Sequence, residues 1–125
     1  MLLGDFFTIS ETKNLDNNSY KITLHLNRKH HIFEGHFPGN PIVPGVCLTQ
    51  MVKEILESIL KRSFNMVKAD NIKFTAIVNP EITPALEAKL SLKFLVNEEI
   101  QAELSFYLGE TTYYKFKGSF VSAAS

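Results

Sequence analysis

The sequence of 125 residues has a single cysteine, no excess of charge of either sign and no long apolar run. With only Cys47 present, no disulfide can form within the chain, and this composition suits a reducing cytoplasm. Thirteen basic and thirteen acidic residues cancel, so no strong field attracts nucleic acid or an anionic membrane. The stretch MLLGDFF has an acid at position 5 and no long apolar core. We therefore expect neither a signal peptide nor a membrane span.

Repeats, linkers and low-complexity segments are also missing, so we expect residues 1–125 to form a single domain. Apolar residues make up 45% and charged residues 21%, ordinary values for a globular protein. No CxxC or HExxH spacing occurs, and the spacing of the histidines at 25, 30, 31 and 36 does not suit a structural metal. We expect no metal site and no cofactor.

The sequence contains one clear helical pattern. Apolar residues recur at three- and four-residue steps from Leu48 to Leu60, which predicts an amphipathic helix ending near Lys61. Pro44 and Gly45 mark its start.

Alternating apolar and polar residues predict strands on both sides of this helix. Before the helix, residues 20–26 alternate cleanly, residues 5–10 fit either a strand or a turn of helix, and residues 14–19 are a turn cluster. After it, strands are expected from about Asn71 to Pro80 and over residues 86–96, 102–108 and 114–120, with turns at 97–99 and 109–112. The pattern predicts an α+β domain in which the helix lies on an antiparallel meander.

Residues 31–50, HIFEGHFPGNPIVPGVCLTQ, hold three of the five prolines and three of the six glycines, which makes a stiff loop. An imidazole held there, at His36, can serve as a general base near neutral pH, although a structural histidine is the alternative. The helix start at Gly45 and Val46 offers free N–H groups that can bind a carbonyl oxygen as negative charge develops on it. Together they suggest chemistry at the carbon next to a carbonyl.

The string from His31 to Val46 resembles the active-site signature of the 3-hydroxyacyl-[acyl-carrier-protein] dehydratases, the FabZ/FabA family with the hotdog fold. The triplet IKF at 72–74 and the order strand, loop, long helix, strands agree with it. The resemblance implies a long central helix wrapped by a curved antiparallel sheet. It also implies a dimer, either of this chain or with another hotdog subunit, whose active sites are shared across the interface.

By this resemblance, His36 would remove the α-proton of a β-hydroxyacyl thioester carried on acyl carrier protein, and the Gly45 N–H would polarise the thioester carbonyl. A carboxylate on the partner subunit's helix would protonate the leaving hydroxyl group. The substrate would lie against Phe37, Pro38, Gly39 and Val46.

The chain departs from the family at Gln50, fourteen positions after the histidine, where the family has a carboxylate. An amide cannot deliver a proton, and general acid catalysis is worth roughly 10²–10⁴ in rate, or about 3–5 kcal/mol. Glu54 lies one turn further, so the family's common Glu-x-x-x-Gln pair is present in swapped order. Its carboxylate would be displaced by ~6 Å. A projection places Gln50, Glu54 and Glu57 opposite the apolar stripe, so the alternative for Glu54 is a solvated surface charge.

Three functions stay open on the sequence alone. They are a 3-hydroxyacyl-[acyl-carrier-protein] dehydratase of fatty-acid or related lipid or polyene synthesis, a non-catalytic subunit that binds acyl chains or an active dehydratase, and a hotdog thioesterase. Cys47 is expected to be a small buried residue rather than a nucleophile. A basic set could dock an acidic carrier protein or be an ordinary solvated surface: Arg28, Lys29, Lys61 and Arg62.

Overall fold

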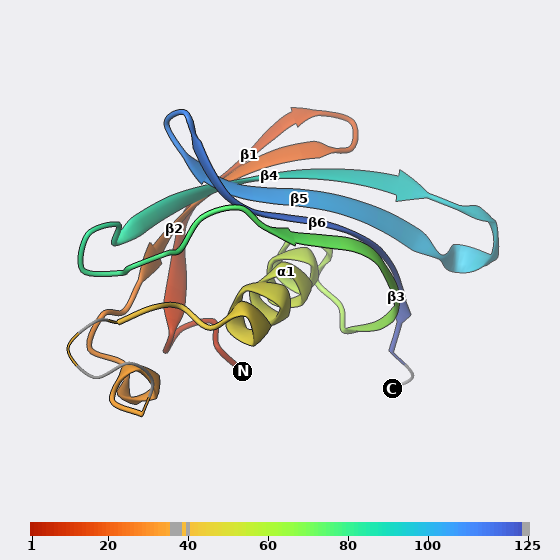
Figure 1. Ribbon diagram of the computed structural model, residues 1–125. Helices are drawn as coiled ribbons and strands as arrows, with labels where there is room; N and C mark the ends of the chain where they lie inside the picture. The colour runs from red at the N-terminus through yellow and green to blue at the C-terminus, as the bar shows by residue number, and fades with distance from the viewer. Residues whose placement is uncertain (36–38, 40, 124–125) are drawn as a thin grey trace.

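The computed structural model describes residues 1–35, 39 and 41–123. In chain order the elements are β1 (Phe7–Asp16), β2 (Ser19–Leu26), the short 3-10 helix η1 (His31–Phe33), α1 (Gly45–Leu60), β3 (Phe64–Phe74), β4 (Ala85–Phe94), the 3-10 turn η2 (Val96–Glu98), β5 (Ile100–Leu108) and β6 (Thr111–Ser122). All strand pairs are antiparallel and form one sheet in the order β1-β2-β4-β5-β6-β3. The sheet curves around α1 (Figure 1), which confirms the predicted α+β hotdog fold.

The central helix α1 begins where the sequence predicted. Pro44 is its N-cap residue, and Lys61, with a left-handed backbone (φ 57°), is its C-cap residue. The Lys61 N–H donates to the Glu57 carbonyl oxygen at 2.8 Å. The predicted apolar stripe is buried at Leu48, Met51, Val52, Ile55 and Leu56. Within the described part of the chain, no helix is long and apolar enough to cross a membrane.

The predicted meander is confirmed in β4, β5 and β6, because alternate residues of these strands face the helix. The inward side chains are buried, and they include Leu90 of β4, Leu104 of β5 and Phe116 of β6, which lie in register across the sheet. The predicted strand at 20–26 is confirmed as β2. Together with α1 these strands enclose the hydrophobic core.

The two edge strands differ from the prediction. β1 continues to Asp16, so the turn cluster predicted at 14–19 shrinks to residues 17–18. β3 starts at Phe64 rather than Asn71 and stops at Phe74 instead of running to Pro80. Both strands pair with one neighbour only and are largely exposed, so no apolar alternation marks them in the sequence.

Candidate active site

The loop leading into α1 is fixed at both ends. At its start, His30 is buried and its Nε2 lies 2.9 Å from Asp5 Oδ2, while its Nδ1 accepts from the Ile32 N–H at 3.1 Å. With Nδ1 accepting, the proton is on Nε2 and is donated to Asp5. At its end, the Val43 N–H donates to the Val78 carbonyl oxygen at 2.9 Å. These contacts fix where the chain enters α1.

Three of the predicted site residues, His36, Phe37 and Pro38, lie outside the described residues, and their roles stay predictions. Gly39 is exposed and has φ +80°, a backbone conformation that favours glycine. A tight change of chain direction here therefore requires the glycine of the predicted motif.

The start of α1 has the free N–H groups that the sequence predicted. Cys47 and Leu48 are the first residues of the helix whose N–H groups donate backbone hydrogen bonds, both to the Pro44 carbonyl oxygen, at 3.0 and 3.2 Å. No described side chain caps this end, and the N–H groups of Gly45 and Val46 find no acceptor among the described residues. They stand at the positive end of a sixteen-residue helix, which suits binding of a developing oxyanion.

Phe74, at the end of β3, explains why position 45 is glycine. A Cβ atom at Gly45 would come within 2.8 Å of the Phe74 ring. The ring therefore packs on the bare backbone of the helix start, although 59% of the residue is exposed. Sequence reasoning had only noted the triplet IKF that contains Phe74, without this contact.

A groove runs between α1 and β3 and brings several predicted residues together. The residues that line it are Gly45, Val46, Thr49, Gln50 and Lys53 from α1, and Asn65, Met66, Ile72 and Phe74 from β3. Val46 is 78% exposed at this surface, as expected for a residue that contacts a ligand. Gly45, Val46 and Gln50 thus share one site, and Glu54 is not part of its lining.

The sequence did not predict that Thr49 would line the groove as a polar residue held by a hydrogen bond. Thr49 Oγ1 lies 2.7 Å from the hydroxyl oxygen of Tyr114, which is fully buried on β6. Burial raises the pKa of the Tyr114 hydroxyl, and the hydrogen bond to Thr49 opposes that rise. The pair fixes the Thr49 side chain beside Gln50 on the helix. No sequence signal links residues 49 and 114, because only the curvature of the sheet brings them together.

The alternative that Glu54 is a solvated surface charge is wrong, because its carboxylate is buried. It is 1% exposed, and its carboxylate accepts from the Leu3 N–H at 2.7 Å and the Leu2 N–H at 2.9 Å. Burial opposes ionisation of Glu54, but the hydrogen bonds from Leu2, Leu3 and Gln50 outweigh it and lower its pKa. The physical reason for the error is that residues 2–3 cover the face of α1 that the projection left open to solvent.

Glu54 also orients Gln50. The Gln50 Nε2 donates to Glu54 Oε2 at 2.8 Å, which leaves Oε1 and one N–H of the amide for the groove. No carboxylate occurs among the described residues that line this groove. The groove therefore presents a fixed amide at position 50, where the resemblance described above implies a carboxylate.

The remaining candidates are the single cysteine and the possible metal ligands. Cys47 is buried as predicted, and burial raises the pKa of its thiol. Across residues 1–35, 39 and 41–123, no three His, Cys, Asp or Glu side chains are grouped so that they could hold a metal ion.

A long helix inside a curved antiparallel sheet, with a groove beside the start of the helix, defines a hotdog protein. The sequence model of the ApeI-like family, described as ApeI dehydratase, matches residues 11–117, and the chain belongs to this family.

Two curated relatives are both called 3-hydroxyacyl-[acyl-carrier-protein] dehydratase FabZ. The protein of Rickettsia typhi is 29% identical over an alignment of 92 residues, and the match covers 59% of this chain and 63% of that protein. The protein of Caldicellulosiruptor bescii is 32% identical over an alignment of 69 residues, and the match covers 49% of each chain. The chain thus spans about half to two thirds of these relatives.

Among solved structures, the dehydratase heterocomplex ApeI:P from Xenorhabdus doucetiae has the same fold. Its TM-score is 0.65 at 18% identity, and the match covers 90% of this chain and 96% of the other.

Proposed function

We propose that this chain is a subunit of a dehydratase that converts 3-hydroxyacyl thioesters, carried on acyl carrier protein, into trans-2-enoyl thioesters and water. The observation that carries the proposal is the pair of free N–H groups at Gly45 and Val46, which open on a groove between α1 and β3. Membership of a dehydratase family supports the elimination of water, and the FabZ relatives support the carrier-bound substrate. Such a step belongs to fatty-acid or related lipid or polyene synthesis.

In the proposed reaction, the His36 imidazole removes a proton from carbon 2 of the acyl group. The electron pair of that C–H bond forms the double bond to carbon 3 as the bond from carbon 3 to the hydroxyl oxygen breaks. Negative charge on the thioester oxygen in the transition state is stabilised by the Gly45 N–H. The departing hydroxide takes a proton from an acid and leaves as water.

The acid is the part that the described groove lacks. Gln50 occupies the expected position, but its amide has no proton to give at neutral pH. Glu54 lies behind Gln50, outside the groove lining, and its carboxylate already accepts backbone N–H groups. We therefore propose that the chain works beside a second hotdog subunit that supplies the acid. The heterocomplex described for ApeI:P supports such an arrangement, and a homodimer remains the alternative.

The fixed amide favours a second candidate, a non-catalytic subunit that binds the acyl chain or an active dehydratase. Gln50 keeps the hydrogen-bonding capacity of the groove without providing an acid. The thioesterase alternative is less favoured, because the described groove lining has no accessible thiol and proteins named as thioesterases share only the fold with this chain.

Hydration of crotonyl- and longer enoyl-[acyl-carrier-protein], the reverse reaction, tests the proposal. We expect slow hydration by the chain alone, loss of that rate in His36→Ala, and a large increase when an acid-bearing hotdog partner is added. The partner is to be found by purifying the tagged chain from its own organism. A wild-type rate that His36→Ala leaves unchanged contradicts the dehydratase assignment. Binding of enoyl thioester without any hydration, even with the partner, favours the non-catalytic subunit.

A further inference from the structure

A row of lysines crosses the outer face of the sheet, turned away from α1, and the proposed function does not use it. In sheet order the row consists of Lys13, Lys21, Lys89, Ser105, Lys115 and Lys73, each in register with the next. One residue comes from each of the six strands, and five of the six are lysines. We call these residues the lysine row.

Two of the five lysines in the row form ion pairs with carboxylates. Lys21 Nζ lies 2.9 Å from Glu87 Oε2, and Lys13 Nζ lies 3.8 Å from a Glu11 oxygen. Within the part of the chain that the structure describes, no carboxylate oxygen lies within ion-pair distance of the three other ammonium groups, those of Lys73, Lys89 and Lys115.

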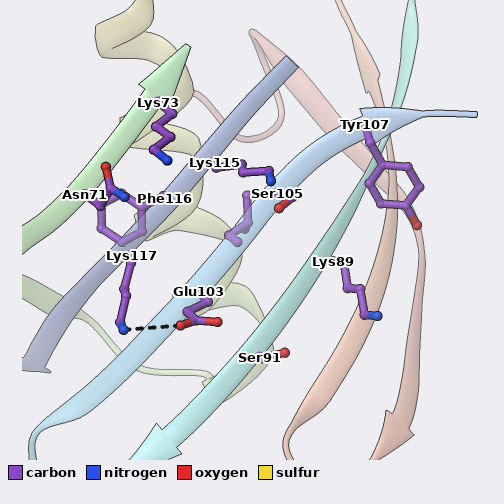
Figure 2. Close-up of a pocket in the computed structure, with 11 residues that line it drawn as sticks. Asn71, Lys73, Lys89, Ser91, Glu103, Ser105, Tyr107, Lys115, Phe116 and Lys117 are labelled. Atoms are coloured by element: carbon purple, nitrogen blue, oxygen red, sulfur yellow. Dashed lines mark ion pairs between the residues drawn. The ribbon is translucent and has the colours of Figure 1, made fainter. Parts of the chain in front are cut away.

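A shallow hollow surrounds these three lysines on the outer face (Figure 2). They stand around Ser105, and the hollow is also lined by Ser91 and Asn71. The dashed line in Figure 2 joins a different lysine, Lys117, to Glu103 at 3.6 Å. Three exposed cations therefore share one surface with hydroxyl and amide groups that can donate hydrogen bonds.

Like charges directly opposite each other destabilise a sheet, so the stability of the fold does not explain the lysine row. Lysine on an edge strand blocks unwanted pairing with other sheets, which accounts for Lys13 on β1 and Lys73 on β3. It does not account for Lys89 and Lys115, which lie on interior strands, each directly opposite another lysine of the row. A threonine at either position would suit the sheet better.

We propose that Lys73, Lys89 and Lys115 dock the acidic face of one helix of a partner protein. Neighbouring strands are ~4.8 Å apart, which puts Lys115 at ~10 Å and Lys73 at ~14 Å from Lys89 along the row. On an α-helix, carboxylates at positions i, i+7 and i+11 share one face and lie at 0, ~10.5 and ~16.5 Å. The flexible lysine stems cover the difference of about 2 Å.

The width of the positive strip also fits a single helix. Glu87 precedes Lys89 by two residues on β4, and Glu103 lies opposite Ser91, two residues after Lys89. These acids border the strip on both sides, four residue positions or ~13 Å apart, close to the 10–12 Å diameter of a helix. A membrane plane or a nucleic-acid strand would also meet the bordering acids, and the chain's net charge of zero gives no long-range attraction for such polyanions.

The test uses a synthetic helical peptide with glutamates at i, i+7 and i+11, and a control peptide of equal composition with the glutamates on different faces. Binding is measured by fluorescence anisotropy at low and high salt. We expect the ordered peptide to bind the wild type and to lose affinity with salt, because exposed ion pairs are screened. Lys73→Glu/Lys89→Glu/Lys115→Glu should weaken binding by at least ~10-fold. The matched control changes two exposed lysines outside both the row and the basic set, Lys68→Glu/Lys93→Glu, and should bind like the wild type. It is compared with Lys89→Glu/Lys115→Glu, which changes the same charge within the row and should weaken binding.

A second variant separates docking from folding. Lys115→Thr should raise the melting temperature, because it relieves repulsion with Lys73, and should still weaken peptide binding. Equal loss in the control variant and in its matched row variant, or equal binding of both peptides, overturns the proposal. Tighter binding of single-stranded DNA or phosphatidylserine vesicles than of the peptide, lost in the row variant, also overturns it, since the surface would then bind phosphate. None of these outcomes depends on thioester hydration, so they leave the proposed function to its own test.

Discussion

Gln50→Glu is the change that most directly tests the missing acid. In the wild type, the Gln50 Nε2 donates to Glu54 Oε2 at 2.8 Å. The substitution puts a second carboxyl group at that distance, and two carboxylates so close cannot both ionise near neutral pH. We therefore expect the pair to hold one proton, which makes the introduced group a carboxylic acid at the wall of the groove.

The size of this effect follows from the distance of 2.8 Å. With an effective dielectric constant of about 20, two unit charges at this separation repel by about 6 kcal/mol, or roughly four pKa units. If solvent at the groove halves this repulsion, a shift of about two units still brings a glutamic acid from about 4.3 to above 6. The proton stays on the introduced group, because the N–H groups of Leu2 and Leu3 hold Glu54 in its ionised form.

The assay is the initial rate of enoyl thioester hydration as a function of pH. We expect Gln50→Glu to raise the rate at neutral pH by up to roughly 10²–10⁴, and the gain to fall as the shared proton is lost at higher pH. Glu54→Gln combined with Gln50→Glu removes the repulsion, so the alkaline limb of its pH profile should lie at lower pH. Gln50→Leu removes the amide without adding an acid and should show no gain.

A folded Gln50→Glu variant with the wild-type rate at every pH refutes the reasoning, because the acid would then not be the missing part. Circular dichroism and the melting temperature verify folding. A gain that Gln50→Leu shares refutes it as well, since it would come from loss of the amide. If the alkaline limb of Gln50→Glu/Glu54→Gln lies at higher pH than that of Gln50→Glu, Glu54 does not raise the pKa of the introduced carboxyl group.

Four further predictions concern Glu54, Gly45 and Gly118. Glu54→Ala leaves the N–H groups of Leu2 and Leu3 without their acceptor and should lower the free energy of unfolding by about 2–3 kcal/mol in urea denaturation; a loss near zero contradicts the burial of this carboxylate. The pKa of Glu54 is lowered in the folded state. The ionised carboxylate therefore contributes fully to the free energy of unfolding above the unfolded pKa of about 4.3, and this contribution is lost as pH falls through the folded pKa. The difference in free energy of unfolding between wild type and Glu54→Gln should accordingly shrink on acidification. Gly45→Ala should displace the Phe74 ring and raise KM with little change in melting temperature, whereas Phe74→Ala in the same chain should restore KM. Gly118→Ala puts a Cβ atom 2.5 Å from the Lys68 carbonyl oxygen and should cost about 1–3 kcal/mol. Gly35→Ala, whose added Cβ atom would meet no described residue within 4 Å apart from its chain neighbours, should be neutral.

The parts of the fold that could be predicted are those whose residues are buried on one face. Leu90 and Leu104 alternate with polar neighbours because β4 and β5 are covered by α1, so the sequence carries their period. β3 could not be predicted between Phe64 and Asp70, because as an edge strand it exposes both faces beyond Phe64. The helix start at Gly45 was predictable because Pro44 and Gly45 are residue types that favour the beginning of a helix.

The site was predictable only as far as it is local in sequence. Gly45, Val46 and Gln50 lie within six residues, and a helix of known start places them on one groove. The burial of Glu54 depends on Leu2, which is 52 positions away, and a helical projection contains no information about such a contact. The Thr49–Tyr114 hydrogen bond was missed for the same reason.

The order of the amide and the carboxylate on α1 decides which of them lines the groove. Position 50 lines the groove, whereas position 54 faces the backbone of Leu2 and Leu3. With the carboxylate at 54, the charge stabilises the fold, because it accepts from two N–H groups that would otherwise be buried without an acceptor. The groove then keeps a fixed amide whose Oε1 can accept from the hydroxyl group of a 3-hydroxyacyl chain. Substrate binding and proton donation are thereby separated, so affinity for the thioester should survive in a chain whose turnover depends on an acid from elsewhere.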